Sequence, residues 1–133
     1  MRIDITKYLG IPYKHLGRDF SGVDCLGISY LFFKTEFNVI LPDPAYPEDW
    51  ENDGQNLIEE GYDKICDPTD RPARYGIIGF RMPGHAVEHH LGIVMWDMDQ
   101  FLHSPLNNQS CLSRLSEPIW KRSVSSFYKV RGV

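Results

Sequence analysis

Cys25 is the residue whose setting most strongly indicates chemistry. It follows a turn-rich stretch, residues 10–24, and it begins an apolar run that extends to Phe37. Backbone N–H groups at a helix N-terminus, together with the helix dipole, favour an anion, so a cysteine placed there is expected to have its thiol pKa lowered toward the reactive thiolate. A cysteine in front of a helix is often structural, and a nucleophile needs a base. The chain must therefore supply a histidine that reaches Cys25.

Two histidines flank a pair of predicted strands. His90 precedes the apolar segment Leu91–Trp96, and His103 ends the segment Gln100–His103. If these segments pair through the short turn at residues 97–99, the hairpin sets the two imidazoles side by side. His103 could then hold one imidazole nitrogen of His90 while the other nitrogen faces the thiol, an orienter, base and nucleophile arrangement.

The apolar pattern changes period along the chain. Residues 25–37 carry apolar side chains at helical spacing on most sides, which predicts a buried helix. Later segments rich in aromatic and β-branched residues predict strands at residues 76–80, 91–96, 100–103 and 126–130. Short connections favour antiparallel neighbours, because a parallel crossover needs a dozen or more residues. The prediction is an α+β fold in which the helix that bears the nucleophile packs on an antiparallel β-sheet.

The segment from Pro42 to Pro72 has a different composition. It holds ten of the 18 acidic residues, two basic residues and five prolines. This pattern predicts an excursion over the surface, with one short helix near residues 48–60. Trp50 in this segment could cover a cleft or form a partner surface, although a solvated acidic loop is the simpler interpretation.

Length and composition limit the remaining classes. The length of 133 residues and the hydrophobic content of 42% indicate one domain, residues 1–133. A net charge of −4 argues against a nucleic-acid partner. Three cysteines without a Cys-x-x-Cys pair indicate neither a disulfide framework nor a zinc ribbon. The chain shows no signal peptide and no apolar run that could span a membrane, so we expect synthesis in the cytoplasm and no membrane span.

A competing motif occupies residues 85–89. His85, Glu88 and His89 form the inverted zincin pattern His-x-x-Glu-His, in which two histidines one helical turn apart bind zinc and the glutamate acts as a base. The preceding Pro83-Gly84 and the strand that follows at Leu91 leave less than two turns of helix to present both imidazoles. We therefore expect a loop at the mouth of the cleft and neither a metal nor another cofactor.

Taken together, these residues resemble the NlpC family of papain-like cell-wall endopeptidases over nearly the whole chain. The elements that carry the resemblance are Gly10-Ile11-Pro12-Tyr13, Gly17, Asp24-Cys25-Leu26-Gly27, His90-Leu91-Gly92-Ile93 and Phe101-Leu102-His103, and residues 118–131 are similar to the closing strand of that family. Gly17-Arg18-Asp19 and Leu41-Pro42 resemble members found in bacteriophage tails. Leu26 stands where many members have serine, which could alter the preferred stem peptide, and Leu16 stands where a second glycine is common, which could reshape the loop under Tyr13.

The resemblance implies a papain-like fold and hydrolysis of an amide in peptidoglycan stem peptides, near γ-D-glutamate. In this interpretation Cys25 attacks the carbonyl, His90 moves the proton and His103 orients His90. Tyr13 is a candidate contact for the oxyanion or the substrate, and the backbone N–H of Cys25 is a second donor. Asp24 could recognise a substrate amine or simply cap the helix.

Partners and place of action follow from the same resemblance. We expect peptidoglycan or a muropeptide as substrate and bacteriophage tail proteins as candidate partners, with action at the cell wall, in a virion tail or on recycled muropeptides. Two alternatives stay open: a papain-like amidase or acyltransferase on another substrate, and a non-catalytic tail or scaffold component. An intact set of Cys25, His90 and His103 argues against the scaffold, which has no need of all three.

Overall fold

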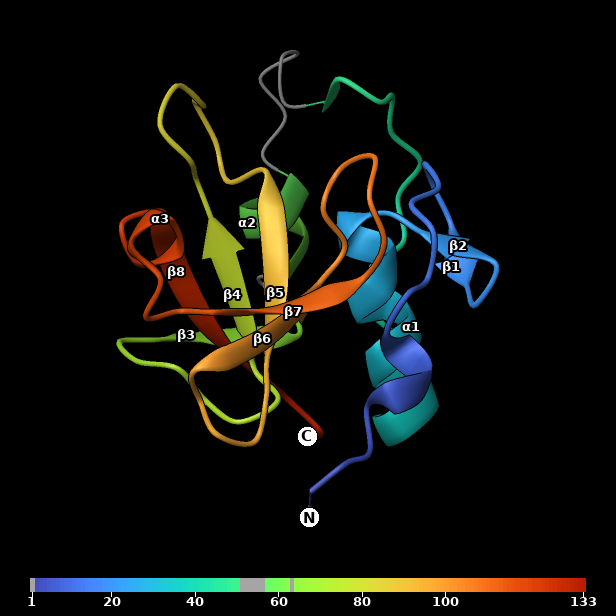
Figure 1. Ribbon diagram of the computed structural model, residues 1–133, viewed down its shortest axis with the longest axis horizontal. Coiled ribbons are helices and arrows are strands. Elements are labelled where there is room, and N and C mark those ends of the chain that lie inside the picture. The colour runs from blue at the N-terminus through green and yellow to red at the C-terminus, as the bar shows by residue number, and fades with distance from the viewer. Residues whose placement is uncertain (1, 51–56, 63) are drawn as a thin grey trace.

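In the part of the chain that the structure describes, six antiparallel strands form the main sheet (Figure 1), in the order β3-β8-β4-β5-β6-β7. The computed structural model describes residues 2–50, 57–62 and 64–133. The main-sheet strands are β3 (Cys66–Thr69), β4 (Ile77–Phe80), β5 (His90–Val94), β6 (Gln100–His103), β7 (Cys111–Arg114) and β8 (Val124–Val130). The other elements are the 3₁₀ helix η1 (Thr6–Tyr8), the short pair β1 (Arg18–Asp19) and β2 (Gly22–Val23), and the helices α1 (Cys25–Phe37), α2 (Leu57–Tyr62) and α3 (Pro118–Lys121).

Helix α1 covers the residues that the apolar pattern predicted. The Asp24 carboxylate accepts a hydrogen bond from the Gly27 N–H and so caps the first turn. At the other end Asn38 takes the left-handed conformation, and its N–H bonds to the carbonyls of Phe33 and Lys34. Both ends of the helix therefore have local signals that a sequence can carry.

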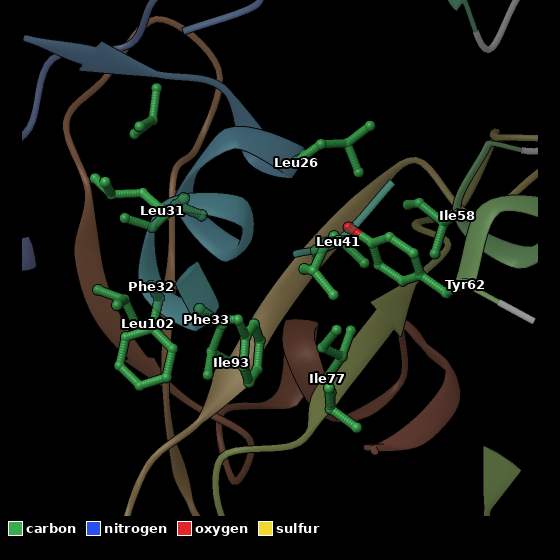
Figure 2. Close-up of a cluster of buried hydrophobic side chains, with 14 of the residues drawn as sticks. Leu26, Leu31, Phe32, Phe33, Leu41, Ile58, Tyr62, Ile77, Ile93 and Leu102 are labelled. Carbon is green, nitrogen blue, oxygen red and sulfur yellow. The ribbon is translucent and has the colours of Figure 1, made fainter. Parts of the chain in front are cut away.

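The main core lies between α1 and one face of the sheet. Leu31, Phe32 and Phe33 of α1 pack with Ile77 of β4 and Ile93 of β5, and Figure 2 shows these side chains converging. Because strand side chains alternate between faces, Ile78 and Val94 join a smaller cluster on the other face, together with Trp120 of α3. Helices α1 and α3 thus cover opposite faces of the sheet, and the predicted α+β, papain-like arrangement is confirmed.

The hairpin between β5 and β6 forms as predicted. Ile93 pairs with Leu102 and Val94 with Phe101, both antiparallel. The turn is closed by the Asp97 carboxylate, which accepts from the N–H groups of Asp99 and Gln100. Met98 takes a φ of 62° between them. This hairpin sets His103 beside β5, the strand that begins at His90.

The prediction of a solvated acidic excursion at residues 42–72 was wrong for its aromatic residues. Tyr46 and Trp50 are each 6% exposed and pack against each other in the main core. Ile58 and Tyr62 of α2 are buried in the same cluster. The predicted helix near residues 48–60 falls partly on residues 51–56, outside the described residues. The acidic residues are thus interspersed with apolar ones that face inward, a pattern that the net composition of the segment hides.

The sheet also contains strands that the sequence analysis did not predict. Cys66–Thr69 pairs with β8 at one edge, and Cys111–Arg114 pairs with β6 at the other. Both segments are short and mostly polar, so alternation gives little signal. In the part of the chain that the structure describes, no helix is long and apolar enough to cross a membrane.

Candidate active site

Cys25 is the first residue of α1 and lies beside the start of β5. Its thiol donates a hydrogen bond to the backbone carbonyl oxygen of His89, with 3.6 Å between Sγ and O. His89 is the residue directly before His90. Figure 1 shows the starts of α1 and of β5 at the same end of the molecule. The fold therefore brings the candidate nucleophile to the strand that carries the candidate base.

A glycine lets the entry loop approach this helix end closely. A Cβ built on Gly27 would lie 2.0 Å from the carbonyl oxygen of Gly17, well inside any permitted contact. The loop at Gly17 is held in turn by its own N–H, which donates to Lys14 O. Gly27 is thus required because the backbone of the loop occupies the space where a side chain would be.

The resting state of the Cys25 thiol differs from the sequence prediction. Burial raises its pKa to about 12, and the neighbouring negative charge of Asp24 acts in the same direction. Arg18 and the backbone N–H groups of Leu26 and Cys25 lower the pKa, as expected of a helix N-terminus, but they do not outweigh burial. In the free protein Cys25 is therefore a neutral thiol.

His90 and His103 are in contact, as the hairpin predicted. His90 Nε2 lies 2.8 Å from His103 Nδ1. His103 Nε2 lies 2.9 Å from the Ser113 hydroxyl, and Cys111 Sγ is 3.6 Å from the same nitrogen. These contacts allow two directions of hydrogen bonding, and the direction that suits a general base has His90 Nε2–H donating to His103 and His103 Nε2–H donating to Ser113. In this arrangement His90 Nδ1 carries no proton and is free to accept one.

Aromatic side chains enclose both imidazoles. The Trp120 ring lies 5.8 Å from the His90 ring and 5.1 Å from the His103 ring, measured between centroids. Phe80 and Phe101 complete the enclosure. Burial lowers the pKa of His103 to about 4, and burial together with His103 lowers the pKa of His90 well below its usual value. Both histidines are therefore neutral near pH 7, the protonation state that a general base requires.

Asp24 is the centre of a buried polar network. One carboxylate oxygen accepts from the Gly27 N–H and from Arg18, each at 2.8 Å. The other accepts from the Leu16 N–H at 2.9 Å and from the Tyr46 hydroxyl at 2.6 Å. Of the two roles that the sequence left open for Asp24, the structure shows the cap. All four hydrogen bonds come from the chain itself, whereas contact with a substrate amine stays a prediction.

Tyr13 lies in the neighbourhood of the thiol. Its side chain is half-buried, and its backbone is held by the Asn108 carbonyl and by a bridge to Val23. Burial raises the pKa of the Tyr13 phenol, and the nearby Cys25 and Asp24 add to the shift. The phenol therefore stays protonated and can act as a hydrogen-bond donor.

The His-x-x-Glu-His motif is not helical. Residues 81–89 form a loop, in which the rings of His85 and His89 stack with their centroids 3.7 Å apart. Glu88 is buried and accepts hydrogen bonds from Ser126 and Tyr128 of β8. Its carboxylate fills a hollow over Gly79, where a Cβ would lie 2.5 Å from Glu88 Oε1. Glu88 thus anchors the loop that leads into His89 and His90. Among the described residues, no three His, Cys, Asp or Glu side chains form a group that could hold a metal ion.

Several residues of the site escaped the sequence analysis. Arg18 and Tyr46 hold Asp24, Ser113 ends the histidine chain, and Trp120 covers it. Cys111 also touches His103. Each contact joins segments far apart in the chain. The spacing of Cys111 and Ser113, two residues apart as expected for one face of a strand, was the available signal.

Comparison with known proteins identifies a matching family and several similar structures. The model of the NlpC/P60 family matches residues 10–129. Three similar solved structures are the NlpC/p60 domain of the peptidoglycan hydrolase SagA (17% identity, TM-score 0.64, covering 93% of this chain and 91% of that one), an NlpC/P60 family protein from Bacillus cereus ATCC 10987 (18%, 0.65, 92% and 36%), and a protein described as similar to a lipoprotein, NLP/P60 family, from Staphylococcus aureus subsp. aureus Mu50 (20%, 0.65, 93% and 38%).

The family match and the structural matches support different conclusions. At identities of 17–20% the solved structures show the fold alone. This chain spans less than two fifths of the Bacillus and Staphylococcus chains. No curated protein matches the sequence. Nothing in the reported matches concerns a bacteriophage tail, so that finer assignment stays a prediction.

Proposed function

The chain belongs to the NlpC/P60 family, and from that premise we propose that it is a cysteine peptidase that hydrolyses an amide bond in peptidoglycan stem peptides, beside γ-D-glutamate. The substrate class is supported by the SagA domain, which is described as part of a peptidoglycan hydrolase and is similar over most of both chains. One observation carries the mechanism: His90 Nε2 bonds to His103 Nδ1 at 2.8 Å, next to the carbonyl that receives the Cys25 thiol.

The first step is attack by sulfur on the substrate carbonyl carbon. His90 Nδ1 accepts the thiol proton while Sγ bonds to the carbon and the carbonyl π electrons move to oxygen. Because the resting thiol and imidazole are both neutral, this transfer accompanies attack and needs no preformed ion pair. In the tautomer that this step requires, His90 Nε2–H donates to His103 and His103 Nε2–H donates to Ser113, which leaves His90 Nδ1 as the acceptor.

The developing oxyanion requires hydrogen-bond donors. Tyr13 supplies a protonated phenol, and the Cys25 backbone N–H lies at the first position of α1, where helical N–H groups have no intrahelical partner. The helix dipole favours the same charge. Tyr13 and the start of α1 would thus stabilise the tetrahedral intermediate together.

Breakdown and release return the enzyme to its starting state. The imidazolium of His90 donates its proton to the leaving amine as the C–N bond breaks, which leaves a thioester on Cys25. Water then attacks the thioester carbon, and His90 takes a proton from that water. The C–S bond breaks, and the proton returns to sulfur. The products are an amine and a carboxylic acid.

The proposal is tested by mass spectrometry of soluble muropeptides incubated with the protein. We expect cleavage by the wild type, loss of cleavage in Cys25→Ala, and no effect of a zinc chelator; the fragment masses identify the bond. Cys66→Ala, which removes a buried thiol at the sheet edge, is the matched control and should still cleave.

Other outcomes would overturn the proposal. Cleavage that survives Cys25→Ala but is lost with the chelator would favour a zinc site at His85–His89. Absence of cleavage in every sample, with the native fold verified by circular dichroism, would favour another substrate or a structural role.

A further inference from the structure

A positively charged hollow lies beside the loop that leads to His90. It has a volume of about 350 Å³ and is lined by Arg81, Met82, Pro83, Gly84, His85 and Arg122. Arg81 directly follows β4, and Arg122 directly follows α3. The backbone joins the two walls, because the Arg81 N–H donates to the carbonyl of Ser123 at 2.8 Å. Two arginines that are far apart in the chain therefore line one concave surface.

The charge of the hollow is not compensated within the described part of the chain. Neither Arg81 nor Arg122 has an ion pair there, whereas Arg18, Arg114 and Arg131 each pair with an aspartate. The chain has an excess of acidic residues and a net charge of −4, so carboxylates are abundant. A concave site with two unpaired guanidinium groups is suited to an anion from outside the chain, and guanidinium matches a carboxylate with two parallel hydrogen bonds.

His85, which lines one side of the hollow, is linked by contacts to the candidate nucleophile. The His85 ring stacks on the ring of His89, and the His89 carbonyl accepts the hydrogen bond from Cys25. The His89 N–H donates to the carbonyl of Phe80, the residue before Arg81. One residue thus separates the hollow from the candidate nucleophile along this side.

Arg122, which also lines the hollow, belongs to the segment that covers the candidate base. Arg122 lies two residues after Trp120, whose ring covers both His90 and His103. The hollow is thus linked to Cys25 through His85 and His89, and to the two histidines through the segment that carries Trp120 and Arg122.

We propose that this hollow binds a carboxylate on the substrate residue beside the cleaved bond. The inference rests on the proposed function, because a glutamate joined through its γ-carboxyl keeps its α-carboxylate free. A stem peptide cut beside γ-D-glutamate therefore presents a negative charge next to the scissile amide. Arg81 and Arg122 would hold that carboxylate and so select acidic stem peptides over amidated ones.

The test compares two stem peptides that differ in one group. One carries the free α-carboxylate on γ-D-glutamate, and the other carries an α-carboxamide at the same place. Cleavage of both is measured with the wild type, with the double variant Arg81→Gln/Arg122→Gln, and with Arg71→Gln. Arg71 is the matched control, since its side chain is 82% exposed and pairs with the exposed Asp70.

The expected result is a preference that depends on the two arginines. Because both arginine side chains are exposed to solvent, kcat/KM should favour the acidic peptide by about tenfold in the wild type, which corresponds to about 1.4 kcal/mol. The double variant should lose this preference, and Arg71→Gln should keep it. Equal cleavage of both peptides by the wild type, or a preference that persists in the double variant, would overturn the inference.

Binding without turnover separates this inference from the proposed function. Calorimetry with Cys25→Ala measures the affinity for each peptide, with and without the two arginine substitutions. If the wild type cleaves neither peptide, the proposed function fails. The inference still holds if Cys25→Ala binds the acidic peptide more tightly and loses that difference with the arginines. Equal or absent binding of the two peptides would refute the hollow as a carboxylate site.

Discussion

Replacing Asp24 should reveal whether this residue serves the fold or the substrate. In Asp24→Ala the Gly27 N–H loses its cap, and the Leu16 N–H and the Tyr46 hydroxyl lose their acceptor. Arg18, whose side chain is 14% exposed, loses one of its two carboxylate partners and keeps Asp43 at 2.7 Å. The substitution therefore removes a cap and half of a largely buried ion-pair network at once.

The magnitude follows from these contacts. Loss of an N-cap costs about 1 kcal/mol. Removal of one partner of a buried ion pair costs about 3–5 kcal/mol, and the remaining Asp43 places Arg18 at or below the low end. We expect Asp24→Ala to lower the free energy of unfolding by about 3–4 kcal/mol, a large part of the roughly 5–15 kcal/mol typical of a domain.

Urea unfolding followed by circular dichroism measures this loss. Asp24→Asn keeps an oxygen for the Gly27 N–H but removes the charge, so its loss should be smaller than that of Asp24→Ala. Asp43→Ala is the control, because its side chain is 45% exposed, and it should cost less than about 1 kcal/mol. An Asp24→Ala variant as stable as the wild type, but with a raised KM for a stem peptide, would refute this reasoning and favour recognition of a substrate amine.

Three further predictions concern the helix end, the histidines and the thiol. Gly27→Ala should destabilise the protein by about 2 kcal/mol or more in urea unfolding, because the added methyl group would meet the carbonyl oxygen of Gly17. Gly61→Ala is the control and should not destabilise the protein, because a Cβ at that position has open space around it. Equal effects of the two substitutions would contradict the close approach of the Gly17 carbonyl to Gly27. His103 binds a proton near pH 6.5 in the unfolded chain but only near pH 4 in the native chain, so the free energy of unfolding should fall as pH falls between these values. The expected loss from pH 7 to pH 5 is on the order of 2 kcal/mol, and His103→Asn should reduce it. An unchanged pH profile in the variant would count against a buried neutral His103. Alkylation of Cys25 in the free protein should accelerate with rising pH beyond pH 9, since burial raises the thiol pKa, and a rate plateau below pH 7 would instead indicate a preformed thiolate.

Local signals in the sequence were sufficient for the helix, for the hairpin and for the contact between its histidines. Residues 24–38 supply the cap (Asp24), a continuous apolar surface and the left-handed residue that ends the helix (Asn38), all within one short segment. The turn at residues 97–99 is closed by its own aspartate, and hairpin geometry then follows from chain connectivity. The family assignment, which also uses Gly10–Tyr13, Gly17 and residues 118–131, is confirmed.

The tertiary structure decided what depends on neighbours distant in the chain. Tyr46 is buried in the main core, where its hydroxyl bonds to Arg18 and Asp24, although the segment around it is rich in acidic residues. Ser113 reaches His103 only because β7 pairs with β6. The pKa of Cys25 shows the difference most clearly: the helix N-terminus, visible in the sequence, lowers it, but burial and the charge of Asp24 raise it further. Burial is a property of the packed fold, and the order of residues alone does not determine it.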